Sequence, residues 1–254
     1  MDKRAKFVIT SVLLSAGFTG LSFVGDETRF VAIAVLTAAT VGLFIWSFEG
    51  LTKSATLLVL VLPALFTLGV GVFWFLLPAN LLTRFPIILL YAIGLYALGL
   101  IGNIFIVSTV RTIALLRAAK GVGFVLTLLT SFLLFDAAVS LKASIGMNIL
   151  LVFTITFLLS IQALWTSRVS RELERVVLLY SLVFSYALPA VAALLFFWPV
   201  SVVVGSLFLT VGMYVLLGLG QARIEGRLFA NTSREYIIVG LMVFLAMILA
   251  TAWR

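Results

Sequence analysis

The chain has 254 residues, of which 64% are hydrophobic and 10% are charged, and 17 Lys and Arg residues against 9 Asp and Glu residues give it a formal charge of +8. Soluble domains carry roughly 45–50% apolar and about 25% charged residues, so a soluble fold is excluded. The absence of Cys and His excludes disulfides, thiolate or imidazole catalysis and the usual zinc and haem ligands.

Nine apolar runs, bounded by charges, Pro or Gly, follow one another along the chain. A helix needs roughly 20 apolar residues to cross a bilayer core, and these runs are of that order. They lie at 7–24, 30–48, 55–77, 86–109, 122–141, 146–165, 176–197, 200–219 and 236–253. We therefore predict an all-α fold: a polytopic transmembrane helix bundle of about nine spans, forming one integral membrane domain over residues 1–254.

Three places along the chain affect this count. The first run follows Lys3, Arg4 and Lys6, as in a signal peptide, but it is longer than a usual signal-peptide core, so we interpret it as a retained helix. The seventh and eighth runs are separated only by Trp198-Pro199, where we expect a turn, because one helix over 176–219 would be about twice the bilayer's thickness. The polar segment 220–235 is expected to be the longest connection.

The connections on one side of the predicted spans carry many more basic residues than those on the other side. With the N-terminus in the cytoplasm, 13 of the 17 Lys and Arg residues fall inside, and four fall outside. The outside residues are Arg29, Arg84, Lys142 and Arg254. This asymmetry follows the positive-inside rule and predicts a cytoplasmic N-terminus, an outside C-terminus and a plasma (inner) membrane location. Anionic lipid headgroups at the inner face are the expected partners of the inside residues, and nucleic acid is not expected.

The five Trp residues fall near predicted span ends, which is typical of interfacial anchors. They are Trp46, Trp74, Trp165, Trp198 and Trp253.

Asp136 is the only acid predicted inside a span. A carboxylate at the centre of a membrane helix costs about 2.5–3.5 kcal/mol on insertion scales, so a functional role is the default hypothesis. However, Asp136 precedes Lys142 by only six residues, which places it in the outer third of its span. It either faces a water-filled cavity or is an interfacial carboxylate that snorkels or pairs with Arg84 or Lys142. We favour the interfacial interpretation.

Two further sets of residues are candidates for a site. Asp26 and Glu27 form an acidic pair in the first outside loop and suit an enzyme acting on a lipid-linked substrate, although the loop is short and Arg29 can neutralise them. Asn103, Asn148 and Gln162 can line a polar site between helices broken near Pro63 and Pro189, as in some transporters. Helix packing explains these polar residues equally well.

Function stays open among three classes. A non-catalytic component or assembly partner of a membrane complex, with a protein partner in the membrane, best fits the scarcity of charged residues in the spans. A small permease for a neutral or lipophilic solute predicts a cavity near midplane touching Asn103, Asn148, Gln162, Pro63 or Pro189. An enzyme predicts Asp26, Glu27 and Asp136 within about 10 Å of one another. No metal site and no cofactor are predicted.

Overall fold

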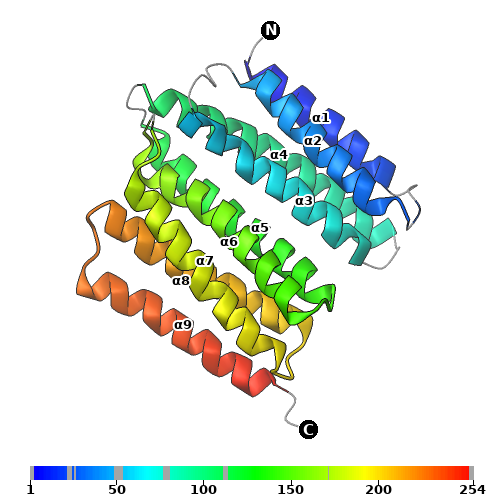
Figure 1. Ribbon diagram of the computed structural model, residues 1–254. Coiled ribbons are helices and arrows are strands. Elements are labelled where there is room, and N and C mark those ends of the chain that lie inside the picture. The colour runs from blue at the N-terminus through cyan, green and yellow to red at the C-terminus, as the bar shows by residue number, and fades with distance from the viewer. Residues whose placement is uncertain are drawn as a thin grey trace. The chain divides into compact units, whose positions relative to one another are not determined.

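The computed structural model describes residues 3–21, 25, 27–48, 54–76, 81–110, 114–170 and 172–251. Within these ranges the regular secondary structure is helical, and no strand is present (Figure 1). The α-helices are α1 (Lys3–Gly20), α2 (Arg29–Ser47), α3 (Val61–Leu76), α4 (Leu81–Ser108), α5 (Leu116–Ser140), α6 (Ile145–Trp165), α7 (Arg175–Phe196), α8 (Val202–Ile224) and α9 (Ala230–Ala250). Two 3₁₀ segments, η2 (Ser54–Leu60) and η3 (Thr166–Arg168), precede α3 and follow α6.

The predicted fold class is confirmed. Eight helical segments in the described part of the chain are long and apolar enough to cross a membrane. The remaining helix, α1, is outside this set: it has 18 residues and includes Lys3, Arg4 and Lys6. The protein is therefore a multi-pass helical membrane protein. Its orientation stays a prediction.

Helix ends near the C-terminus agree with the sequence in one place and differ in another. The expected turn at Trp198-Pro199 is present, because α7 ends at Phe196 and α8 begins at Val202. The Ser201 hydroxyl caps α8 by accepting a hydrogen bond from the Val204 amide. The expected long connection at 220–235 is wrong: α8 runs on to Ile224 and α9 starts at Ala230, so polar residues there extend the two helices.

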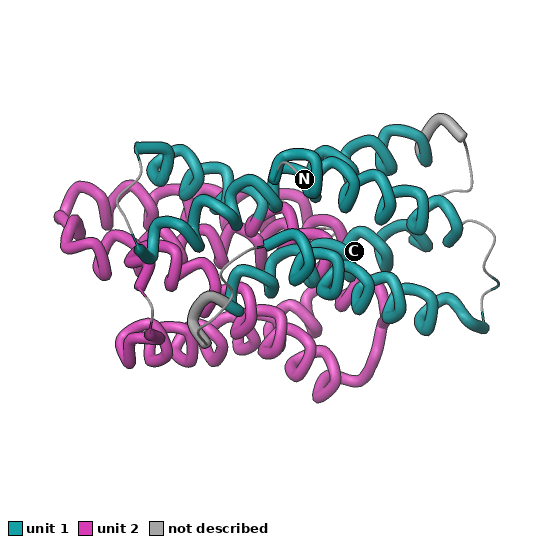
Figure 2. Tube along the Cα trace, turned by 90° about the horizontal axis from the view of Figure 1, so that it is seen from above, with its two compact units in different colours: residues 1–126 teal, residues 127–254 magenta. Residues whose placement is uncertain are grey.

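The helices gather into two compact units, residues 1–126 and residues 127–254 (Figure 2). In the first unit, α1 packs against α2 and α4, and α2 packs against α3. In the second unit, α6 lies along α7, and α8 contacts α6, α7 and α9.

An aromatic and hydroxyl cluster joins helices α1 to α4 of the first unit. The Phe18 ring of α1 lies 4.7 Å from the Tyr91 ring of α4 and 5.0 Å from the Trp74 ring of α3, measured between centroids. The Tyr91 hydroxyl is 3.1 Å from the Thr67 hydroxyl of α3, which is 3.1 Å from the Thr40 hydroxyl of α2. These hydroxyls satisfy one another inside an apolar bundle, where an unpaired polar group would be costly.

The last helix, α9, lies at the edge of the second unit. Of its residues only Met247 is buried. The Phe208 and Phe244 rings are 5.9 Å apart and the Tyr214 and Tyr236 rings 5.2 Å apart, so aromatic pairs join α8 to α9. The remaining face of α9 is apolar and exposed, as expected for a helix that meets lipid or another membrane protein.

The Trp residues are not all interfacial anchors. Trp46 is 49% exposed at the end of α2, whereas Trp74 and Trp165 are fully buried, so for these two the prediction is wrong. The Trp165 indole donates a hydrogen bond to the Ser170 carbonyl, and the Arg84 guanidinium lies 5.0 Å from the Trp74 ring. Both indoles therefore contact polar or charged groups of the protein itself. Trp253 lies outside the described residues.

Candidate functional site

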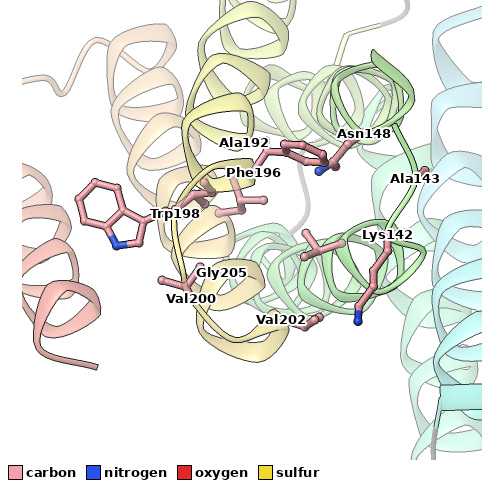
Figure 3. A pocket seen from close by; sticks show the side chains of 12 residues that line it. Lys142, Ala143, Asn148, Ala192, Phe196, Trp198, Val200, Val202 and Gly205 are labelled. Carbon is pink, nitrogen blue, oxygen red and sulfur yellow. The ribbon is translucent and has the colours of Figure 1, made fainter. Parts of the chain in front are cut away.

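A cavity of about 350 Å³ lies at one end of the second unit (Figure 3). It is built where α5 and α7 end and where α6 and α8 begin. Its walls are mainly aliphatic and aromatic, and its lining residues are Val139, Lys142, Ala143, Asn148, Ala192, Leu195, Phe196, Trp198, Val200, Val202, Gly205 and Leu209. Ligand sites commonly have this size and combine apolar walls with a few polar groups.

Asn148 is the buried polar residue of the cavity wall. It lies in the first turn of α6, its side chain is 8% exposed, and it points toward Phe196 of α7 (Figure 3). Its Oδ1 atom is buried and has no hydrogen-bond partner among the described residues. Because buried amide oxygens are nearly always paired, this oxygen is an acceptor available to a molecule in the cavity.

Lys142 is the charged residue of the cavity wall. It lies two residues after the end of α5, in the turn to α6, and its φ angle is +46°. Glycine or asparagine usually occupies this left-handed position after a helix, because a side chain there costs roughly 1–2 kcal/mol. Lys142 is exposed and forms no hydrogen bond or ion pair through its side chain within the described part of the chain. The fold thus holds a free ammonium group at the cavity in an unfavourable backbone conformation.

Trp198 lines the cavity from the turn between α7 and α8, but its indole points away from the other labelled side chains (Figure 3). The indole Nε1 donates a hydrogen bond to the Thr251 hydroxyl at 3.0 Å. Trp198 therefore attaches the end of α9 to this region, and its N–H group is already used.

Asp136 is buried in the structure, with 6% of its surface exposed. Its Oδ1 accepts a hydrogen bond from the Ser206 hydroxyl of α8 at 3.1 Å. The hydrogen-bonding partner is thus a hydroxyl and not Lys142, and Asp136 is not among the residues that line the cavity. Pairing with Arg84, which belongs to the first unit, stays a prediction. Asp136 and Ser206 are nevertheless close in sequence to residues of the cavity wall. Val139 follows Asp136 by three residues, Gly205 directly precedes Ser206, and both Val139 and Gly205 line the cavity.

The acidic pair of the first outside loop is only partly described. Glu27 is exposed in the turn before α2. Asp26 lies outside the described residues. Glu27 belongs to the first unit and Asp136 to the second. The convergence of these three acids, which the enzyme hypothesis requires, stays a prediction.

The remaining polar candidates are spread over both units. Asn103 and Pro63 belong to the first unit, where Asn103 is half-buried and Pro63 is buried. Asn148 and Gln162 both lie in α6, but their separation of 14 positions corresponds to about 21 Å along a helix, so they cannot share one small site. Gln162 is buried near the opposite end of α6, with an Oε1 that lacks a hydrogen-bond partner among the described residues.

The expected helix breaks differ at the two prolines. Near Pro63, the 3₁₀ segment η2 gives way to α3 at Val61, two residues earlier. At Pro189, α7 continues without interruption, because the lost hydrogen bond is a small part of a helix of 22 residues. Pro189 lines an open groove of about 560 Å³ between α6 and α7, together with Phe153, Ser185 and Tyr186.

Sequence reasoning missed two residues of this region. Ser206 carries no recognisable signal, because isolated hydroxyls recur throughout these spans. The sequence indicates Lys142 as an outside basic residue and a possible partner of Asp136, and not as part of a site. Its signal was its place between two spans, on the side where the predicted orientation leaves few basic residues.

A family model described as "Protein of unknown function (DUF5656)" matches residues 9–250. No curated protein and no solved structure matches the chain. Because the match covers nearly the whole chain, this protein belongs to the DUF5656 family.

Proposed function

We propose that the protein is a non-catalytic component of the plasma (inner) membrane, which acts as an assembly or binding subunit of a membrane complex. The observation that carries this proposal is the hydrogen bond between Asp136 and Ser206. General acid–base catalysis requires a titratable group within reach of the reacting atom. The acid described within a span is instead buried against a hydroxyl and lies outside the cavity lining, whose titratable side chain is Lys142.

The same observation argues against a proton-coupled transporter. Pumps usually relay protons through several acids or histidines inside the membrane. This chain has no His, and Asp136 is its one predicted intramembrane acid. The carboxyl group more simply joins α5 to α8.

The exposed face of α9 is the surface that we assign to a protein partner in the membrane. It carries Ile237, Leu241, Leu245 and Leu249, which are 52–86% exposed. Lipid would cover the same face in a protein that acts alone, so the partner has to be tested directly.

The test is affinity purification of the tagged, full-length chain at its native expression level in a mild detergent. We expect one companion protein in fixed stoichiometry, and we expect Leu241→Trp in α9 to remove it. Leu194→Trp is the matched control, because Leu194 is a comparably exposed residue of α7. A chain that purifies alone, or one whose companion is lost equally with both variants, would contradict the proposal.

A small permease is the second candidate. The observation in its favour is the cavity that Asn148 lines. The position of this cavity counts against it, however, because the cavity lies at the helix ends and a permease site is expected near midplane. Solute uptake into proteoliposomes tests this candidate: flux of a neutral solute that Asn148→Leu abolishes would make the permease the better assignment.

A further inference from the structure

We infer that the cavity at the end of the second unit binds the headgroup of an anionic phospholipid, with the Lys142 ammonium contacting the phosphate and Asn148 Oδ1 accepting a hydrogen bond from a headgroup hydroxyl. This inference is independent of the proposed function, because a lone protein and a subunit can both hold a lipid.

The charge of the ligand follows from the cavity's own groups. Two helices end at the cavity and two begin there, so their terminal partial charges largely offset one another. Lys142 then determines the charge of the site, since it is the one charged side chain among the described residues of the lining. The nearest acid along the chain, Asp136, is directed to Ser206. An anionic group is the chemical complement of this site.

The hydrogen-bonding character of the ligand follows from Asn148. Its side chain is more than nine-tenths buried, and its Oδ1 has no partner in the described part of the chain. An amide oxygen accepts hydrogen bonds and cannot donate them, so it selects a hydroxyl or N–H group. A glycerol headgroup offers a hydroxyl next to a phosphate, whereas a choline headgroup offers no donor.

The amphiphilic character of the ligand follows from the walls and their position. Apart from Lys142 and Asn148, the lining is formed by apolar side chains such as Ala192, Leu195, Phe196 and Leu209. These residues belong to helices that cross the bilayer, so the cavity lies where headgroups meet acyl chains. A soluble anion would leave these apolar walls without a partner.

The backbone at Lys142 gives independent support. A lysine in the left-handed region is uncommon, and strained residues of this kind gather at functional sites. In the predicted orientation Lys142 is also one of four basic residues outside, against the positive-inside trend. Both unfavourable features are accounted for if the ammonium group binds a phosphate.

The experiment measures lipid binding to the full-length, detergent-solubilised protein by native mass spectrometry and by the lipid-dependent rise in Tm. The probes are phosphatidylglycerol, phosphatidylcholine with the same acyl chains, and free glycerol phosphate. We expect one phosphatidylglycerol to bind roughly tenfold more tightly than phosphatidylcholine. Both lipids offer a phosphate to Lys142, but the choline headgroup adds a cation that offsets the phosphate charge, and it lacks the hydroxyl from which Asn148 Oδ1 would accept a hydrogen bond. We expect free glycerol phosphate not to displace the lipid.

Two variants assign the binding to the cavity. Lys142→Gln and Asn148→Leu should each weaken phosphatidylglycerol binding roughly three- to tenfold. Phosphatidylcholine binding should be unchanged by Asn148→Leu and should fall less than phosphatidylglycerol binding with Lys142→Gln, because the choline cation already offsets the charge of its phosphate. Arg175→Gln is the matched control, because Arg175 is an exposed basic residue at the other end of the same unit, and it should leave binding unchanged.

Three outcomes would overturn the inference: equal binding of the two lipids, equal weakening by Arg175→Gln and Lys142→Gln, or full displacement by glycerol phosphate. The last outcome would identify a site for a soluble anion. Should a variant fail to fold, the comparison of the two lipids on the unaltered protein still decides.

Discussion

The Ser206 hydroxyl of α8 donates a hydrogen bond to the Asp136 carboxylate of α5 at 3.1 Å, and both side chains are buried. Ser206 also lies 3.1 Å from the Val203 carbonyl of its own helix. This contact links two helices that are far apart in the sequence. It also explains how an acid is accommodated in an otherwise apolar helix without a basic partner.

The first prediction tests this link. Asp136→Asn retains the shape and an acceptor for Ser206, so we expect the free energy of unfolding to change by less than about 1 kcal/mol. Ser206→Ala removes the donor and leaves the buried carboxyl unpaired, which should destabilise the protein by about 1–3 kcal/mol. Equilibrium unfolding in mixed micelles measures both. Equal losses in the two variants would show that the negative charge itself matters, as it would in a functional site.

The second prediction concerns the packing of α9 on α8. A Cβ atom added to Gly218 would lie 2.2 Å from the Tyr236 ring, so Gly218→Ala should destabilise the protein by about 1–3 kcal/mol. Gly42→Ala in α2 is the control, because a Cβ there meets nothing within 4 Å. It should be neutral or stabilising by up to about 1 kcal/mol, from helix propensity. Thermal unfolding compares them, and a loss in both variants would refute the close contact with Tyr236.

The third prediction concerns the backbone at Lys142. Lys142→Gly should raise the free energy of unfolding by roughly 1 kcal/mol in lipid-free detergent, because glycine adopts a positive φ at little cost. Gly226, with a φ of +71° in the turn after α8, is the reciprocal control. Gly226→Ala should lower stability by a similar amount. If Lys142→Gly instead lowers stability in lipid-free detergent, the lysine has a structural role that its backbone conformation does not reveal.

The fourth prediction tests the orientation. The chain contains no Cys, so single Cys substitutions can be labelled without background. A membrane-impermeant maleimide should label Glu27→Cys and Lys142→Cys in intact cells. It should label Glu172→Cys, between α6 and α7, only after the cells are opened. All three residues are exposed at helix ends. The reverse pattern would place the N-terminus outside and the cavity on the cytoplasmic side.

The sequence by itself determined the fold class and the positions of most helices in the described part of the chain. It did so because the bilayer demands long apolar helices whose backbone groups are satisfied internally, a requirement that each segment meets alone. Its errors lay where local composition competes with packing. Polar residues at 220–235 extend two helices, and α7 continues through Pro189, because neighbouring turns sustain a helix that local signals would end.

Only the tertiary structure decided which polar side chains are used and which are free. Asp136, Asn148 and Gln162 look alike in sequence, as single polar residues in apolar runs. The structure pairs Asp136 with Ser206, 70 residues away, places Asn148 in a cavity wall and leaves Gln162 buried at the other end of α6. These differences depend on helix rotation and on contacts between distant segments, to which hydrophobicity along a single span is insensitive.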